Sequence, residues 1–320
     1  MQFLTAQQYY QQLLQQIPQA KKRIVIAAMI IQVDDATQPI FDAIVHAMQR
    51  GVEVLIVVDI YSKAVRPRRL NHRQFGHVWH QTSKTFARLR ELGAQVQVVG
   101  HLGLNPTRHR CHIKITIIDD QVYSFGGVNL SAGSFQNIDY MLATKNAQIA
   151  NTLDNLVQRI ALGQPMIDFE QQLDQHTTLL FDAGKRRRSI IYDYAYRLAA
   201  QAARIYSVSQ MVPSGRLARV IKRTENENYF NHPWQAAKFL AIALIIDKIR
   251  TGLKNSYHRP IYLHAKFILA ELPGGKKALV SGSHNLSWRG VVYATKEIAI
   301  YSTDPKLWAD LKAYVDTAIK

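Results

Sequence analysis

The chain has 320 residues and a formal net charge of +17, because 40 Lys and Arg residues outnumber 23 Asp and Glu residues. This charge predicts an anionic partner, either nucleic acid or an anionic membrane surface. The single cysteine, Cys111, excludes an intrachain disulfide, and no uninterrupted apolar stretch reaches the roughly 18 residues of a membrane-spanning helix. The N-terminus lacks the pattern of a signal peptide. We therefore expect a cytoplasmic protein that lies peripherally on the inner face of the membrane.

The first half of the chain predicts helices and strands in alternation, a pattern typical of an α/β sheet. A helical stripe near the N-terminus ends at Pro18. Two later helices are followed by Gly51 and Gly93, which indicate helix ends. The predicted strands are 23–31, 52–59 and 94–99, and the predicted helices are 9–17, 39–49, 82–92 and 146–162.

The second half repeats part of this pattern. A polar stretch over 222–231 stands where the first half has its second buried strand. The closing helix begins with Asp304 as its cap and Pro305 at its first position. The other predicted elements are a helix over 185–200, a strand over 203–211, a long apolar helix over 234–249 and a strand over 297–301.

These elements predict an α/β fold of two homologous α-β-α sandwich halves, residues 1–165 and 166–320. No Gly/Ser-rich or Pro-rich linker separates the halves. We therefore favour one pseudo-two-fold globule, and two independent domains are the alternative.

One short motif occurs once in each half. It is H-x-K, then an acidic residue five positions after the lysine, then G-[GS]-x-N. On a strand the His and the Lys face the same side, the small residues allow close approach of backbone or ligand, and the Asn amide can donate hydrogen bonds. The first copy consists of His112, Lys114, Asp119, Gly126, Gly127 and Asn129, and the second of His264, Lys266, Glu271, Gly282, Ser283 and Asn285.

Together the two copies supply two imidazoles, two ammonium groups, two amides and the Ser283 hydroxyl. We hypothesise that they form one site for a phosphodiester. The lysines and amides would hold the non-bridging oxygens and the charge of the transition state. One neutral His would attack phosphorus, and the other, protonated, would give its proton to the leaving oxygen. The lysines already supply positive charge, so we predict neither a metal nor a cofactor.

These residues resemble the signature of the phospholipase D superfamily, HxKx4Dx6G[GS]xN in two copies. The first copy fits in full. The second has Glu271 where the superfamily has Asp, and its hairpin is four residues longer, since 285 − 264 is 21 and 129 − 112 is 17. In the superfamily this Asp mainly supports geometry. The local sequences at 110–114, 137–140 and 282–286 are most similar to the bacterial cardiolipin synthase and phosphatidyltransferase branch.

The resemblance implies two phospholipase D-like halves and a ping-pong reaction through a phosphohistidine. The first-copy histidine, His112, would usually be the nucleophile and His264 the acid and then the base, but the near-symmetry of the motif leaves the two roles open. In the superfamily an acidic residue after the Asn often hydrogen-bonds a catalytic His. Asp139 and Glu297 occupy such positions, and we favour this role over plain surface ion pairs.

The resemblance predicts an enzyme, a metal-independent phosphatidyltransferase or phospholipase D acting on glycerophospholipids, with a cardiolipin synthase-like reaction as one candidate. Its partners would be an anionic phospholipid membrane and a phospholipid substrate. A metal-independent nuclease or phosphodiesterase on nucleic acid is the alternative, because the positive charge suits it equally. Intact His and Lys in both copies argue against a non-catalytic binder.

Two basic segments and Cys111 have competing interpretations. The segment 61–80 is either a flap for an anionic head group or a solvated loop, and the spacing of its His72, His77 and His80 disfavours a metal site. The run 185–188 is interpreted as a solvated helix end rather than a phosphate contact. Cys111 is interpreted as a small hydrophobe on a strand, despite its position beside the motif histidine.

Overall fold

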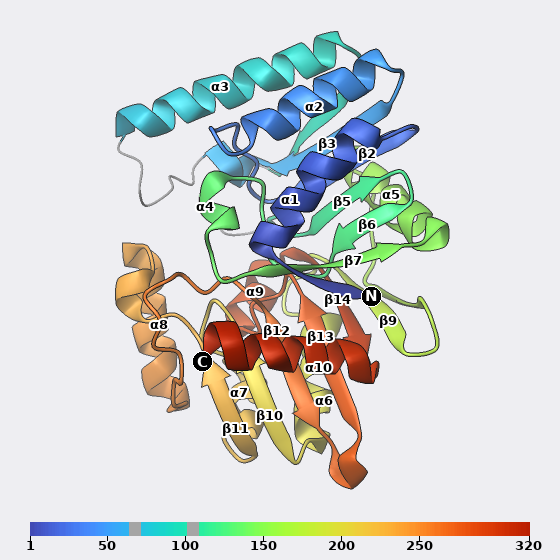
Figure 1. The fold of residues 1–320 in the computed structure, drawn as a ribbon. Coiled ribbons are helices and arrows are strands. Elements are labelled where there is room, and N and C mark those ends of the chain that lie inside the picture. The colour runs from blue at the N-terminus through green and yellow to red at the C-terminus, as the bar shows by residue number, and fades with distance from the viewer. Residues whose placement is uncertain (64–71, 101–108) are drawn as a thin grey trace. The chain divides into compact units, whose positions relative to one another are not determined.

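The computed structural model describes residues 1–63, 72–100 and 109–320 (Figure 1). The chain divides into two compact units. Unit 1 consists of Met1–Ser124, Val128–Gln136 and Tyr140–Met166, and unit 2 of Phe125–Gly127, Asn137–Asp139 and Ile167–Lys320. Two short segments from the first half of the sequence thus belong to unit 2. No helix among the described residues is both long and apolar enough to cross a membrane.

Unit 1 contains a seven-stranded mixed sheet. Its strand order is β1-β7-β6-β5-β2-β3-β4, with β2, β3 and β4 parallel to one another and the other neighbours antiparallel. The strands are β1 (Gln2–Thr5), β2 (Arg23–Ala28), β3 (Glu53–Asp59), β4 (Gln95–Val99), β5 (Lys114–Ile118), β6 (Gln121–Ser124) and β7 (Tyr140–Lys145).

Helices cover both faces of this sheet. The first three helices share one apolar core with alternate residues of β2 and β3, and α5 packs on the opposite face (Figure 1). This gives three layers, as the alternation in the sequence predicts. The helices are α1 (Ala6–Gln16), α2 (Gln38–Gln49), α3 (His72–Glu91), α4 (Ala132–Phe135) and α5 (Ala147–Ala161), with 3₁₀ turns at Ile17–Gln19 and Ile60–Lys63.

Unit 2 contains a second seven-stranded sheet. Its order is β11-β10-β12-β13-β14-β9-β8, with β10 and β11 parallel and the other neighbours antiparallel. The strands are β8 (Phe169–Gln172), β9 (Thr177–Ala183), β10 (Arg204–Val208), β11 (Glu225–Tyr229), β12 (Phe267–Glu271), β13 (Lys277–Gly282) and β14 (Lys296–Ser302).

The helices of unit 2 also form two layers. Helices α6, α7 and α8 share one apolar core, and α10 packs on the other face of the sheet (Figure 1). The helices are α6 (Ile190–Gln201), α7 (Arg216–Ile221), α8 (Lys238–Thr251), α9 (Trp288–Tyr293) and α10 (Pro305–Tyr314), with 3₁₀ turns at Pro233–Gln235 and Pro273–Gly275 and a π turn at Val315–Ile319.

The predicted α/β fold with two homologous halves is confirmed by the strand orders. Six neighbours in unit 1, β3-β2-β5-β6-β7-β1, correspond in order and direction to β11-β10-β12-β13-β14-β9 in unit 2. Each unit then adds one strand, β4 beyond β3 in unit 1 and β8 beyond β9 in unit 2. In both units the motif H-x-K leads into the strand beside β2 or β10, at the centre of the sheet.

Several predicted elements were wrong. The polar stretch 222–231 contains a strand, β11, and is polar because β11 lies at the edge of its sheet. The apolar helix begins at Lys238, after a turn at Pro233. The basic run 185–188 precedes α6, whose cap is Ser189. In the predicted basic loop, 64–71 lie outside the described residues, and the part from His72 onward is helix α3.

Candidate active site

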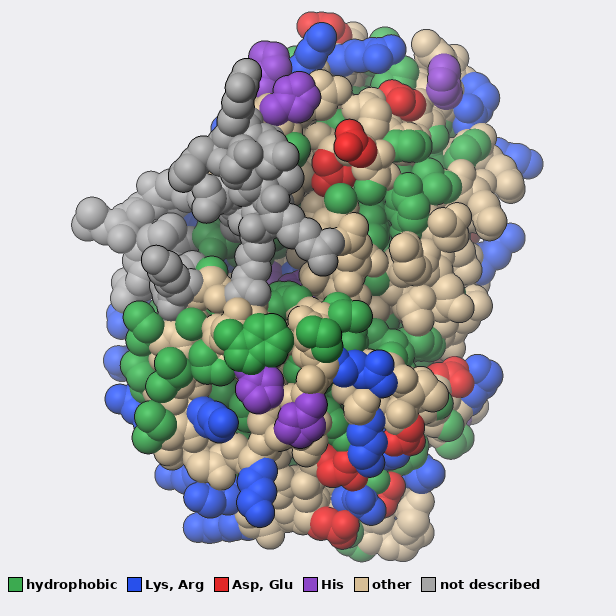
Figure 2. All heavy atoms as spheres, turned by 60° about the vertical axis from the view of Figure 1, so that its left-hand side comes forward, with side chains coloured by type: hydrophobic (Ala, Val, Ile, Leu, Met, Phe, Trp, Pro, Cys, Tyr) green, Lys and Arg blue, Asp and Glu red, His purple; other side chains and the backbone are tan. Residues whose placement is uncertain are grey.

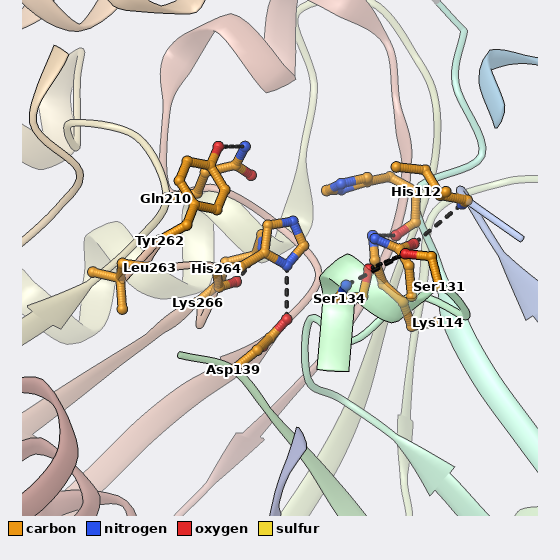
Figure 3. A network of polar contacts seen from close by, with 12 residues as sticks. His112, Lys114, Ser131, Ser134, Asp139, Gln210, Tyr262, Leu263, His264 and Lys266 are labelled. Carbon is orange, nitrogen blue, oxygen red and sulfur yellow. Dashed lines mark hydrogen bonds and ion pairs between the residues drawn. The ribbon is translucent and has the colours of Figure 1, made fainter. Parts of the chain in front are cut away.

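The first motif places His112 and Lys114 at the start of β5, in unit 1. Both residues are buried, with exposures of 7% and 1%. The Lys114 Nζ donates a hydrogen bond to the His112 carbonyl oxygen at 2.6 Å (Figure 3). This bond ties the ammonium group to the backbone of the histidine, so the predicted pair of side chains is present as one local unit.

An ion pair fixes the segment that leads into His112. Asp59, the last residue of β3, pairs with Arg110 Nη1 at 2.9 Å, and its other oxygen accepts from the Cys111 amide at 2.6 Å. Burial raises the pKa of the Asp59 carboxyl, although these hydrogen bonds and the guanidinium oppose the shift. Sequence reasoning missed Asp59 and Arg110. The signal available was an acidic residue at the carboxyl end of a buried strand. Cys111 is buried, as its interpretation as a small hydrophobe requires.

Asn129 lies in a loop that unit 1 holds firmly. Its Oδ1 accepts a hydrogen bond from the Ile30 amide at 3.2 Å, and Leu130 forms a parallel bridge with Ile31. The next residue, Ser131, caps α4. The loop after β2 therefore fixes the G-[GS]-x-N element of the first motif.

In unit 2, His264 forms a hydrogen bond with Asp139. The His264 Nδ1 and the Asp139 Oδ2 are 2.7 Å apart, and the Asp139 side chain is fully buried (Figure 3). A carboxylate on Nδ1 stabilises the imidazolium and fixes the tautomer, so that Nε2 is the nitrogen that can react. The expectation that an acidic residue after the Asn bonds a motif histidine is confirmed for Asp139. The histidine that it contacts comes from the other copy of the motif.

The backbone around Asp139 is paired with the segment that carries His264. Ile138 forms a parallel bridge with Leu263, and its carbonyl accepts from the amides of His264 and Ala265 at 2.9 and 3.0 Å. The hydroxyl of Tyr314 donates to the Asp139 carbonyl at 3.1 Å. The carboxylate is therefore held from several sides.

Gly127, the second glycine of the first motif, packs against this pair. A Cβ at Gly127 would lie 2.6 Å from Asp139 Oδ1 and 2.7 Å from the His264 carbonyl oxygen. Such distances are too short for any side chain, so the close approach of backbone to the His264–Asp139 pair requires glycine. In the second motif the first glycine is the one that is required, because a Cβ on Gly282 would overlap with the backbone of Ile298 and Ala299.

Lys266 repeats the arrangement of Lys114. Its Nζ donates to the carbonyl oxygen of His264, and the side chain is 1% exposed. Burial lowers the pKa of Lys266 to about 8, against the carboxylates of Asp139 and Glu297, which raise it. The ammonium form therefore still predominates at neutral pH.

Ser283 and Asn285 follow β13. The Ser283 hydroxyl donates to Glu297 Oε2 and accepts from the Ile298 amide at 3.0 Å. Its one proton points to Glu297, so we interpret Ser283 as a positioning residue. The Asn285 Oδ1 is buried and has no hydrogen-bond partner among the described residues, while the Asn285 carbonyl accepts from Ser209 Oγ at 2.6 Å.

The two acidic motif residues lie away from these histidine–lysine pairs. Asp119 follows the far end of β5, about 16 Å along an extended strand from Lys114. Its carboxylate accepts from the amides of three residues at distances of 2.7 to 3.1 Å, namely Lys21, Lys22 and Arg23. Burial would raise the pKa of Asp119, but these hydrogen bonds lower it. Glu271 ends β12 and lies opposite Lys277 in the hairpin.

Sequence reasoning also missed an aromatic neighbour of His264. The Tyr262 ring stacks on the imidazole with centroids 6.3 Å apart, and its hydroxyl accepts from Gln210 Nε2 at 2.8 Å (Figure 3). No signal in the sequence identified this contact. The basic run 185–188 is solvated as interpreted, although it lies before α6 and not within it, and Arg188 pairs with Asp168 through a side chain that is 64% exposed.

Comparisons with known proteins agree with this architecture. Residues 13–161 match the family described as "Cardiolipin synthase, PLD-like domain". Over 164 residues, 49% of this chain, the sequence is 26% identical to cardiolipin synthase B of Salmonella typhimurium strain LT2. The match covers 37% of that protein, so the chain spans little more than a third of this relative.

Two solved structures share the fold across nearly the whole chain. Phosphatidylserine synthase of Haemophilus influenzae superposes with a TM-score of 0.70 at 14% identity, covering 98% of this chain and 85% of that one. Polyphosphate kinase of Porphyromonas gingivalis superposes with a TM-score of 0.60 at 12% identity, covering 98% and 49%. At these identities the two structures show the fold alone. The resemblance given by the repeated motif is supported: residues 13–161 match a PLD-like domain, and the chain is similar to a cardiolipin synthase.

Proposed function

We propose that this protein is a metal-independent phosphatidyltransferase or phospholipase D that acts on glycerophospholipid phosphodiesters, in the manner of a cardiolipin synthase. One observation carries the proposal. Each unit holds the same buried pair, in which a lysine ammonium donates to the carbonyl of the histidine two residues before it. A solvated basic strand would not bury its lysines at 1% exposure in both copies.

The reaction follows from the acid–base properties of these groups. The neutral imidazole of His112 attacks phosphorus and forms a P–N bond as the P–O bond to the leaving alcohol breaks, and the leaving oxygen takes a proton from His264. In the second step His264 removes the proton of an incoming hydroxyl, whose oxygen attacks phosphorus and breaks the P–N bond. Water as acceptor gives hydrolysis, and an alcohol gives transfer. Lys114 and Lys266 offset the charge that grows on the non-bridging oxygens.

The contact between His264 and Asp139 supports this assignment of roles. A carboxylate on Nδ1 favours the protonated imidazole, which suits the group that first acts as an acid. Asn129 and Asn285 supply amides for phosphate oxygens in the proposal, and Ser283 orients Glu297. Asp119 and Glu271 support the hairpins.

The match to a cardiolipin synthase supports a lipid substrate. The fold by itself does not decide the substrate, since a polyphosphate kinase shares it. The +17 charge also suits nucleic acid, so a phosphodiesterase acting on single-stranded DNA is the second candidate.

Product analysis tests the proposal directly. The protein would be incubated in EDTA with vesicles of mixed phospholipids, with and without glycerol, and the products identified by mass spectrometry. We expect head-group exchange with glycerol and phosphatidic acid without it. His112→Asn and His264→Asn should each abolish turnover, because each removes one step. If the unchanged protein turns over no lipid but cleaves single-stranded DNA, the second candidate is established instead.

A further inference from the structure

Helix α8 is apolar on two opposite faces, and only one face is buried. Leu240 and Leu244 pack into the core of unit 2. The opposite face carries four isoleucines, at positions i, i+3, i+4 and i+7. These are Ile242, Ile245, Ile246 and Ile249, with exposures of 60%, 44%, 37% and 77%. A helix that is apolar all round is normally buried. This exposed isoleucine row therefore indicates a contact surface.

The exposed charges of this segment are all positive. At 100° per residue, Lys248 and Arg250 project to either side of the isoleucine row, and both are exposed. Between residues 240 and 261 the one acidic residue is Asp247. It is 5% exposed and pairs with Arg289 Nε at 2.9 Å. The row thus lies between cationic margins, with no exposed carboxylate in its own segment.

Two further apolar side chains lie on the segments next to α8. Trp234 is 64% exposed in the turn before the helix, and Ile261 is 47% exposed. Gln235 Nε2 donates to the carbonyls of Arg259 and Ile261, both at 3.0 Å, which holds these two segments together. Figure 2, which brings α8 forward, shows hydrophobic side chains gathered on this surface with Lys and Arg side chains at the margin.

We propose that the isoleucine row, with Trp234 and Ile261, docks the protein on an anionic phospholipid bilayer. The proposal deepens the proposed function, on which it rests, by naming the surface that meets the substrate membrane. Helix α8 would lie in the plane of the interface with its isoleucines at the acyl boundary, and Lys248 and Arg250 would reach the lipid phosphates. Tryptophan suits this depth, because its ring is apolar and its N–H is polar.

A matched pair of double variants tests the docking surface. Ile242→Ser/Ile249→Ser removes two isoleucines of the row. Leu162→Ser/Ile167→Ser removes two other apolar side chains of similar exposure, 69% and 67%, elsewhere on the chain. Binding would be measured by flotation with phosphatidylcholine vesicles that contain about 30 mol % phosphatidylglycerol. We expect the α8 variant to bind about tenfold more weakly and the control to bind as the unchanged protein. Equal binding of all three proteins would overturn the proposal.

Fluorescence locates the contact at Trp234. The emission should shift to the blue on anionic vesicles, and Trp234→Phe should lose most of this shift while still floating with the vesicles. A shift that persists in Trp234→Phe would place the membrane contact elsewhere and would overturn the proposal.

Light scattering tests whether a second copy of the chain covers the isoleucine row. A lower mass for the α8 double variant than for the unchanged protein would assign the row to an oligomer interface instead.

The docking surface and the reaction can fail separately. The α8 double variant should turn over a short-chain phospholipid dispersed below its micelle concentration at an unchanged rate. His264→Asn should bind vesicles normally and show no turnover. Vesicle binding that depends on α8 without turnover of any phospholipid would retain the docking surface and refute the proposed function. Phospholipid turnover, with vesicle binding that is the same in the α8 double variant, would support the proposed function and refute the docking surface.

Discussion

Asp139 accepts a hydrogen bond from His264 across 125 positions of sequence, and both side chains are buried. The carboxylate that orients the second-motif histidine therefore comes from the loop that follows the first motif. The pair lies within unit 2, together with Gly127. The first motif thus contributes to the surroundings of the second histidine.

Asp139→Asn keeps the size of the side chain and removes its charge. The imidazolium of His264 then loses its stabilising partner, so the pKa of His264 should fall and kcat should drop about 10²–10³-fold. The limb of the pH–rate profile that reports the protonated histidine should move to lower pH. Asp310→Asn, at a partly exposed position of α10, serves as the control. A profile that does not move would show that Asp139 only supports the fold.

Lys266 should impose an alkaline limit on activity. Burial lowers its pKa to about 8, and the ammonium form holds phosphate, so kcat/KM should fall as the pH rises through about 8. Lys266→Arg stays charged and should remove this limb while lowering the plateau. An identical alkaline limb in Lys266→Arg would assign it to another group.

The lowered pKa of Lys266 also predicts that stability rises with pH where activity falls. Folded Lys266 releases its proton at a lower pH than the unfolded side chain, so the unfolded state binds more protons between about pH 8 and pH 10. The free energy of unfolding should therefore rise with pH in this window. Urea unfolding at both ends of the window would show the rise, and Lys266→Met should lack it.

Asp119→Ala should cost stability rather than chemistry. The carboxylate accepts three backbone hydrogen bonds from residues 21–23, and losing a charged acceptor should cost about 2 kcal/mol. Its lowered pKa means that this contribution is present at neutral pH and is lost as the pH falls through the folded-state pKa, below about 4. Urea unfolding measures the loss, and activity per folded molecule should be unchanged. A large fall in kcat with intact stability would contradict this role.

Gly127→Ala should disturb the His264–Asp139 pair. The new methyl group would overlap with Asp139 and the His264 carbonyl, so we expect strain of about 1–3 kcal/mol and a marked loss of kcat. Gly133→Ala is the matched control, because no atom lies within 4 Å of a Cβ there. Comparable activity in the two variants would mean that the backbone can move aside.

The sequence predicted the parts of the fold that depend on strong local patterns. Buried strands such as β2 and β3 contain continuous apolar runs rich in Val and Ile, and the closing helix carries its cap and Pro305. Among the edge strands, β1, β8 and β11 were missed because their burial alternates or is low. In β11, the edge position allows Glu225, Asn226 and Glu227 in a strand, and only the pairing with β10 identifies it.

The residues of the candidate site also divide into those that a local pattern predicts and those that depend on the tertiary fold. His112, Lys114, His264 and Lys266 were identified because their spacing repeats, and the spacing follows from the strand period. The buried Asp59–Arg110 pair and the stacking of Tyr262 on His264 depend on the tertiary fold. No local pattern encodes them. Asp139 was a candidate from the sequence, but the partner that the fold gives it belongs to the distant copy.

Because 125–127 and 137–139 belong to unit 2, the chain cannot be divided at its midpoint into two complete units. A cut at the midpoint would leave Asp139 on the N-terminal fragment, separated from His264 on the C-terminal fragment. The contribution runs one way, since unit 1 takes no residue from beyond Met166, so the loss would fall on the C-terminal fragment and its histidine.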